Sequence, residues 1–149
     1  GPITLRLGGT VDRIDAKDTT LRIVDYKTGG SPKTPANIEQ LFTPSESRPN
    51  YIFQTFLYAA IMSRQQSLKV APSLLYIHRA ASESYSPVIE MGEPRQPKIP
   101  VSNFAFFEDE FREHLQRLLE EIFDKNEPFT QTEDTKKCAY CDFKAICKR

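Results

Sequence analysis

Apolar and polar residues alternate through two stretches near the start of the chain, residues 3–15 and residues 20–28. Both stretches are rich in β-branched side chains, and a short polar segment, residues 16–19, separates them. Alternation with a period of two is typical of strands, and a short polar connection between two strands is typical of a hairpin. The pattern therefore predicts a β-hairpin over residues 3–28.

Two later segments have the pattern of helices. Residues 51–66 contain no Gly or Pro and are apolar on nearly every side up to Ser63, which predicts a helix buried against a sheet. In residues 103–125 apolar side chains recur at spacings of three and four with charged residues between them, which predicts a long amphipathic helix. We expect its apolar stripe to pack on the rest of the domain; the stripe consists of Phe104, Phe107, Phe111, Leu115, Leu118 and Ile122.

The remaining segments complete the predicted order of elements. Residues 29–50 and 92–100 are rich in Gly and Pro and are expected to be loops, the first with one helical turn near residues 37–41. Residues 73–78 and 85–91 have the composition of further strands. The order strand, strand, helix, strand, strand, helix predicts a layered α/β or α+β fold.

The size and charge of the chain narrow the class of protein. A chain of 149 residues with 39% hydrophobic content suits one domain with a core. Its 20 basic and 20 acidic residues cancel, so overall charge does not recruit a polyanion and any nucleic-acid contact must come from a local patch. The sequence has no run of about 18 apolar residues and no export signal, so we expect a soluble, cytoplasmic protein with no membrane partner. Because it begins Gly1-Pro2 and enters a strand almost at once, we expect a fragment of a longer protein.

An acid and a lysine continue an apolar face near the end of the hairpin. Side chains alternate across a strand, so Asp25 and Lys27 share one face. An unpaired buried charge is costly, so this pair needs mutual contact, a metal or an open cleft. Asp12 supplies a second carboxylate from the neighbouring strand, and two adjacent carboxylates favour a hard divalent cation. The alternative is a structural ion pair between Asp25 and Lys27, with Asp12 paired to Arg13 or Arg22.

The segments G-G-T-V-D-R-I-D and I-V-D-Y-K-T-G, which contain these residues, closely resemble motifs of the PD-(D/E)XK nucleases. Within that superfamily the chain looks most like the RecB and AddB exonucleases and the CRISPR-associated adaptation nucleases. The resemblance implies a restriction-endonuclease-like mixed sheet flanked by helices, with the N-terminal part of the family fold missing. It also implies that Asp12, Asp25 and the backbone carbonyl of Tyr26 hold Mg²⁺ or Mn²⁺. Lys27 would then orient the attacking water and stabilise phosphate charge, as metal-assisted hydrolysis requires.

Gln54 and Tyr58 lie four residues apart in the helix predicted over residues 51–66, so they share one helical face. They match the Q-x-x-x-Y motif of the same nucleases. The resemblance implies that this pair borders the active site and helps to hold substrate or catalytic water. Taken without the resemblance, Gln54 would make a local polar contact and Tyr58 would be an ordinary core residue.

The three cysteines, Cys138, Cys141 and Cys147, all lie near the C-terminus. Their number and spacing favour a metal or cluster in a reducing compartment over disulfides, and we expect the three thiols to converge. They resemble the iron-sulfur anchor of AddB-type and CRISPR-associated nucleases, which implies a [4Fe-4S] cluster in the parent protein, with its fourth thiolate from outside this sequence. Zinc with a histidine is the alternative, although His78 and His114 lie at no standard finger spacing from the cysteines.

The resemblance implies a metal-dependent DNA exonuclease domain of a RecB- or AddB-like repair and recombination protein, with a nuclease core in residues 1–128 and a cysteine segment in residues 129–149. DNA is the expected partner, with a helicase domain or subunit as a further one. Family members carry an acidic or histidine residue in a helix before the first strand, and this helix is absent from the sequence. We therefore expect the metal site and activity of the fragment alone to be incomplete. The alternatives are a catalytically idle module that binds DNA or serves as a scaffold, and a zinc-stabilised binding domain unrelated to nucleases.

Overall fold

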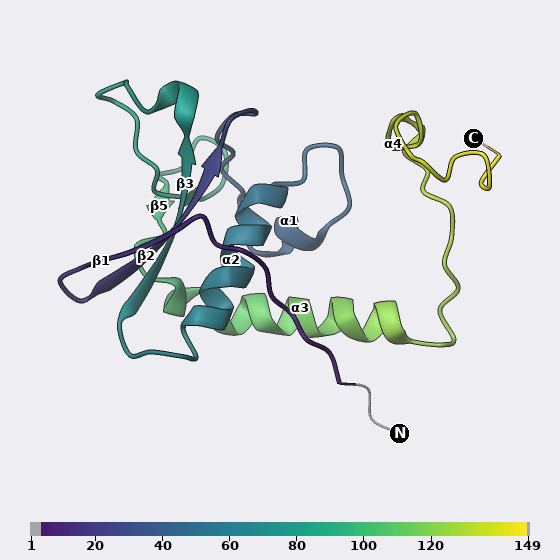
Figure 1. The fold of residues 1–149 in the computed structure, drawn as a ribbon, viewed down its shortest axis with the longest axis horizontal. Helices are drawn as coiled ribbons and strands as arrows, with labels where there is room; N and C mark the ends of the chain where they lie inside the picture. The colour runs from purple at the N-terminus through teal and green to yellow at the C-terminus, as the bar shows by residue number, and fades with distance from the viewer. Residues whose placement is uncertain (1–3, 149) are drawn as a thin grey trace. The chain divides into compact units, whose positions relative to one another are not determined.

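The computed structural model describes residues 4–148 and has a mixed α+β architecture, as predicted (Figure 1). By compactness the chain divides into two units, one ending at Gln116 and the other beginning at Arg117. The boundary predicted after residue 128 stays a prediction. In chain order the elements are β1 (Arg13–Lys17), β2 (Thr20–Lys27), α1 (Glu39–Phe42), α2 (Asn50–Met62), β3 (Lys69–Tyr76), η1 (Ile77–Arg79), β4 (Glu90–Met91), β5 (Ile99–Pro100), η2 (Phe104–Phe106), α3 (Glu108–Phe123) and α4 (Thr135–Cys138).

The main sheet has the strand order β1-β2-β3. Strands β1 and β2 form the predicted antiparallel hairpin, and Asp18 in its turn adopts a φ of 53°, a conformation that Asp tolerates better than most residues. The first strand begins at Arg13 rather than at residue 3, because residues 4–12 pair with no strand. Strand β3 runs parallel to β2 along its whole length, and such a pair requires a crossover, which contains α2.

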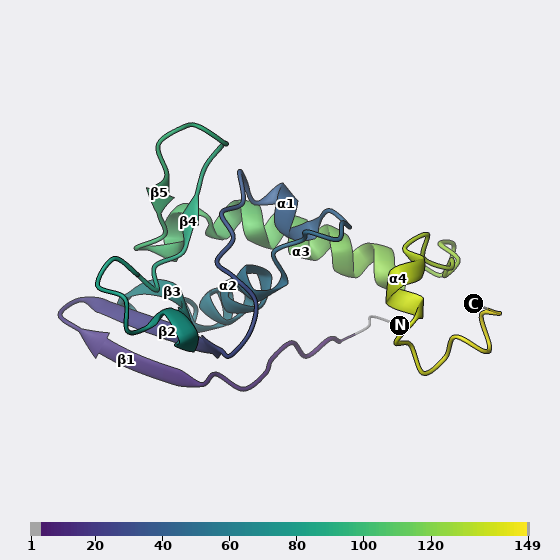
Figure 2. The same cartoon turned by 90° about the horizontal axis from the view of Figure 1, so that it is seen from above.

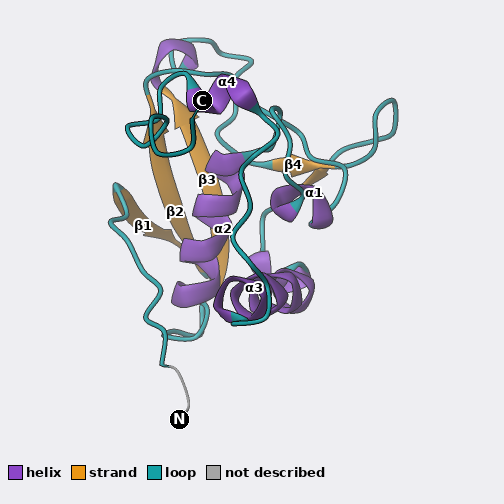
Figure 3. Cartoon of the chain, turned by 90° about the vertical axis from the view of Figure 1, so that its right-hand side faces the viewer, coloured by secondary structure: helices purple, strands orange, loops and turns teal. Residues whose placement is uncertain are grey.

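Helix α2 covers one face of this sheet and lies between the sheet and the first part of α3 (Figures 2 and 3). Phe56 of α2 and Ile23 of β2 are fully buried in the core that forms there. The mostly apolar surface of α2 is thus explained by contacts on two sides. The helix ends at Met62, earlier than the predicted residue 66, and the predicted turn near residues 37–41 is present as α1.

The apolar stripe predicted for the last long helix is confirmed for its first part. Phe104 and Phe111 are fully buried and meet edge to face at 5.9 Å, while Phe107 and Leu115 are partly buried against the same core. Ile122 is 44% exposed, so the prediction was wrong for this residue. No described residue from 117 to 148 is buried, so this unit offers no core of its own to cover Ile122.

The predicted strand over residues 85–91 is reduced to β4, which pairs with β5. Upstream of β4, the side chain of Tyr85 bonds to backbone groups of β3 that would otherwise pair with a neighbouring strand. Its hydroxyl donates to the carbonyl of Leu74 at 2.7 Å and accepts from the amide of Tyr76 at 2.9 Å. Pro87 lacks an amide hydrogen and cannot donate to a ladder. This explains why the chain runs beside β3 with one isolated bridge, at Val88.

Candidate active site

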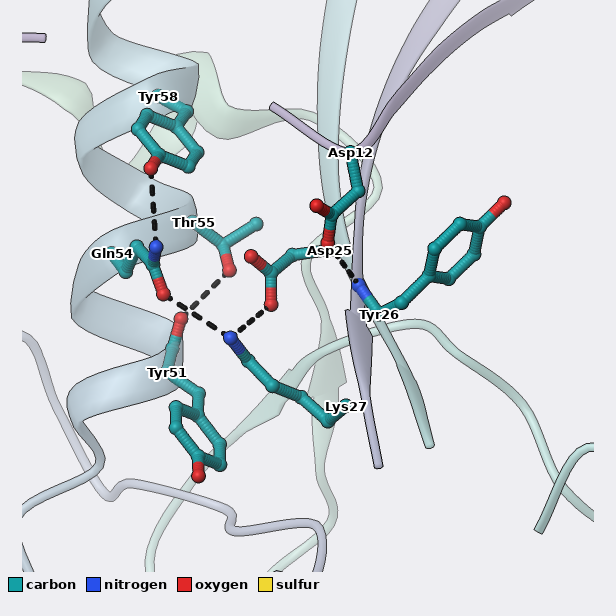
Figure 4. Close-up of polar contacts among 8 residues, drawn as sticks. All are labelled: Asp12, Asp25, Tyr26, Lys27, Tyr51, Gln54, Thr55 and Tyr58. Atoms are coloured by element: carbon teal, nitrogen blue, oxygen red, sulfur yellow. Dashed lines mark hydrogen bonds and ion pairs between the residues drawn. The ribbon is translucent and has the colours of Figure 1, made fainter. Parts of the chain in front are cut away.

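Asp12 and Asp25 lie side by side at the open end of the hairpin. The last paired position is Arg13 with Val24, and the same register continued by one residue sets Asp12 opposite Asp25. A carboxylate oxygen of Asp12 accepts a hydrogen bond from the backbone amide of Tyr26 at 2.8 Å, which fixes the carboxylate beside the strand (Figure 4). Asp12 is exposed, whereas Asp25 is only 3% exposed. One carboxylate is therefore open to solvent and the other belongs to the core.

Lys27 lies on the same strand face as Asp25, as the alternation of side chains predicts. Its ammonium forms an ion pair with Oδ2 of Asp25 and donates to Oε1 of Gln54 at 3.2 Å. The same ammonium lies 4.3 Å from the centre of the Tyr51 ring, within the range of a cation–π contact. Lys27 thus joins strand β2 to helix α2.

Gln54 and Tyr58 share the face of α2 that points toward Lys27, because residues four apart meet on a helix. Nε2 of Gln54 donates to the Tyr58 hydroxyl at 3.1 Å while its Oε1 accepts from Lys27, so the amide links the lysine to the tyrosine (Figure 4). One polar chain runs from Asp25 through Lys27 and Gln54 to Tyr58. The structure brings these four residues together, with Asp12 at the strand end.

The opposite face of the hairpin carries an unrelated set of charges. The ring of Tyr26 points away from the cluster (Figure 4). Asp15 accepts two hydrogen bonds from Arg22, at 2.7 and 2.9 Å, and pairs with Arg13 at 2.8 Å. The hydrogen bond from Arg22 lowers the pKa of Asp15. Both arginines thus pair with Asp15, and neither ion pair involves Asp12.

The charge and hydrogen bonding of the cluster fit a divalent cation. Oδ2 of Asp25 is buried and accepts no hydrogen bond from the described residues, and it forms an ion pair with the ammonium of Lys27. Asp12, Asp25 and Lys27 together carry two negative charges and one positive charge. Mg²⁺ is commonly bound through one or two carboxylates, with waters and substrate phosphates completing its shell. Within residues 4–148 no three acidic, histidine or cysteine side chains form a group that could hold a metal ion, so a cation at this cluster would have two carboxylate ligands.

The cysteine segment does not show the convergence predicted for its thiols. Cys138 ends the short helix α4, and Cys141 and Cys147 follow in turns, all three partly exposed. They form no metal-holding group in the described part of the chain. A [4Fe-4S] cluster requires four thiolates, and the sequence has three cysteines, so these residues alone do not fit the cluster.

Two residues that contact the cluster, Tyr51 and Gly9, were not predicted from the sequence. Tyr51 lies three residues before Gln54 on the same helical face, a spacing that could have revealed it. Gly9 passes so close to Tyr58 that a Cβ on this glycine would lie 2.5 Å from the tyrosine hydroxyl oxygen. The sequence feature that could have indicated Gly9 is the Gly8-Gly9 pair shortly before Asp12.

Comparison with known proteins agrees with this geometry. A family model described as the PD-(D/E)XK nuclease superfamily matches residues 1–148, a range that includes every residue of the cluster. No curated protein and no solved structure matches the chain. In residues 4–148 the structure contains no helix long and apolar enough to cross a membrane.

Proposed function

The chain belongs to the PD-(D/E)XK nuclease superfamily, and from this premise we propose that it is a metal-dependent deoxyribonuclease, the exonuclease module of a RecB- or AddB-like DNA repair and recombination protein. The observation that carries the proposal is the presence of two adjacent carboxylates, those of Asp12 and the buried Asp25, beside a single ammonium, that of Lys27. The Lys27 ammonium offsets one of the two negative charges, and a divalent cation would offset the charge that remains beside Asp25. Asp12 supplies the second carboxylate beside it.

Each residue of the cluster has a role in phosphodiester hydrolysis. Asp12, Asp25 and the backbone carbonyl of Tyr26 would hold Mg²⁺ or Mn²⁺; when bound, the ion lowers the pKa of a water and offsets phosphate charge. The ammonium of Lys27 is a donor for the attacking water or a phosphate oxygen, where charge increases in the transition state. Gln54 holds Lys27 in place by accepting from its ammonium. Tyr58 in turn accepts from Gln54 and fixes the orientation of its amide.

The RecB-like assignment rests on the order of the motifs along the chain. Asp12, the D-Y-K triplet at residues 25–27 and the Q-x-x-x-Y pair occur in the order of the RecB and AddB exonucleases. The proposal therefore includes DNA as substrate and a helicase domain or subunit as partner. We further propose that in the parent protein the three cysteines bind a [4Fe-4S] cluster, together with a fourth thiolate from outside this chain. Iron and sulfide analysis of the anaerobically purified parent protein tests it, and stoichiometric zinc without iron would refute it.

The proposed activity is tested with matched linear and covalently closed circular DNA, each incubated with the intact parent protein in Mg²⁺, in Mn²⁺ and in EDTA. We expect release of nucleotides from the linear molecule in the presence of either ion and none in EDTA. The circle offers no end and should resist digestion. Cleavage of both molecules would replace the exonuclease by an endonuclease, and binding of DNA without cleavage in either ion would favour an idle, DNA-binding module.

A further inference from the structure

A pocket lined by two cationic side chains, Lys33 and Arg48, and by the acidic Glu46 adjoins the cluster at the start of α2. Its cavity of about 250 Å³ lies between the loop after β2 and the loop that leads into α2, and Tyr76 of β3 also lines it. The lining residues used below are Gly30, Lys33, Arg48, Asn50, Tyr51 and Tyr76. This volume is below the range of about 300–1,000 Å³ typical of pockets for drug-sized ligands, so it suits one small unit of a larger molecule.

The pocket is linked to the active site through Tyr51. The ring that lines the pocket also lies 4.3 Å from the ammonium of Lys27, and Tyr51 is 41% exposed. Gly30 brings the loop against this ring: its φ is +80°, and a Cβ there would lie 3.4 Å from Tyr51 and 3.9 Å from Tyr76. The pocket therefore adjoins Lys27 and has two aromatic rings in its wall.

The cationic side chains of the pocket are held by neighbouring groups. The Lys33 ammonium donates to the carbonyls of Ser47 at 2.8 Å and Arg48 at 3.3 Å, which ties the two loops together. The Arg48 guanidinium lies 5.3 Å from the centre of the Phe53 ring and donates from Nε to Asn50 at 2.8 Å. Within residues 4–148 this is the one hydrogen bond of the guanidinium, which has five donors. The remaining donors suit a phosphate.

We propose that this pocket binds one nucleotide of the DNA strand next to the scissile phosphate, with its phosphate at Arg48 and its base against Tyr51. The proposal rests on the nuclease function proposed above and names the group that positions its substrate. Aromatic side chains bind bases of any sequence by stacking, and a guanidinium binds phosphate through paired hydrogen bonds. A strand held in this way would place the neighbouring phosphate near Lys27.

The test is a titration of the ¹⁵N-labelled chain, without metal, with deoxyadenosine 5′-monophosphate, deoxyadenosine and inorganic phosphate. We expect the monophosphate to shift the backbone amides of Gly30, Asn50 and Tyr51, and to bind more tightly than either of its parts. Arg48→Gln should weaken its binding roughly tenfold, and Tyr51→Leu roughly fivefold or more. Arg64→Gln is the control: it removes a guanidinium beyond the C-terminal end of α2, away from the pocket, and should leave the affinity for the monophosphate unchanged.

Three results would each overturn the pocket proposal. The backbone amides of Gly30, Asn50 and Tyr51 do not shift with the monophosphate; Arg48→Gln binds the monophosphate as tightly as the unaltered chain does; or inorganic phosphate alone produces the same shifts. A kinetic measurement separates this from failure of the nuclease proposal. In DNA cleavage Arg48→Gln should raise KM and leave kcat unchanged, because Arg48 binds the substrate away from the reacting phosphate. If the chain binds the monophosphate in the pocket but the intact parent protein cleaves DNA in neither metal ion, the nuclease proposal fails and the pocket is retained only as a nucleotide-binding site.

Discussion

The ammonium of Lys27 lies 3.2 Å from Oε1 of Gln54, and this contact joins β2 to α2 at the candidate active site. The two residues are 27 positions apart in the sequence. A lysine side chain has several rotatable bonds, and its useful position depends on contacts that restrict them. Gln54 on one side and the ring of Tyr51 on the other supply that restriction.

Loss of the Gln54 amide should lower the rate of the chemical step. We predict that Gln54→Leu reduces kcat for DNA cleavage by roughly tenfold or more with little change in KM, because the amide accepts from Lys27 and positions its ammonium. Gln65→Leu, an exposed glutamine past the end of the same helix, is the control. A rise in KM with unchanged kcat would assign Gln54 to substrate binding instead.

Gly9 should be required for the position of Tyr58. Gly9→Ala would bring a Cβ within 2.5 Å of the tyrosine hydroxyl oxygen, so either the ring or the chain before Asp12 must move. We predict a clear loss of cleavage activity in Gly9→Ala. Gly8→Ala is a matched control, since a Cβ at that position meets nothing within 4 Å. Equal activity of the two variants would show that the packing of Gly9 on Tyr58 is unimportant.

The aromatic cluster beneath α2 should account for a large share of stability. Phe111 is fully buried and its ring lies 5.9 Å from those of Phe56 and Phe104. We predict that Phe111→Ala lowers the free energy of unfolding by about 3–5 kcal/mol, as measured by urea denaturation. Phe106→Ala removes the same side chain at an 82% exposed position and should cost far less. A similar loss in both variants would contradict the assigned core.

Alkaline pH should destabilise the chain through Tyr76. Burial, and then the nearby Tyr85, raise the pKa of Tyr76 above its ordinary value of 10.0, so the folded chain holds this proton more tightly than the unfolded chain. The resulting stabilisation is complete below pH about 10 and is lost as the pH rises through the folded-state pKa. Urea denaturation between pH about 9 and about 11 should therefore show a steeper loss for the unaltered chain than for Tyr76→Phe. Parallel curves would contradict the shift.

The sequence predicts the elements with strong periodicity and misses those that depend on distant partners. The hairpin, α2 and the first part of α3 follow from alternation and from spacings of three and four. The start of β3 was missed because Pro72 suggests a break, yet Pro72 lies within the strand opposite Ile23. The strand predicted from residue 85 is shortened because the Tyr85 hydroxyl takes the place of ladder hydrogen bonds.

The candidate site divides in the same way. Asp25 and Lys27 share a strand face and Gln54 and Tyr58 share a helix face, so both pairs could be predicted from local geometry. The contact between the two pairs, from Lys27 to Gln54, could not be predicted from the sequence, because it depends on how α2 packs on the sheet. Tyr51 was not predicted because an aromatic residue at the start of an apolar helix has the pattern of a core residue, although its spacing from Gln54 places it on the same helical face.

Cleavage of linear DNA in Mn²⁺ by the Asp25→Ala and Lys27→Ala variants of the intact parent protein tests the central claim most directly. Each substitution removes a charge that acts on the transition state, so we predict a loss of roughly 100-fold or more in kcat. Circular dichroism should show that the fold is kept. Asp15→Ala, which removes an acid on the opposite face that pairs with Arg13 and Arg22, should leave the rate unchanged. Full activity in either Asp25→Ala or Lys27→Ala would contradict the assignment of this cluster as the active site.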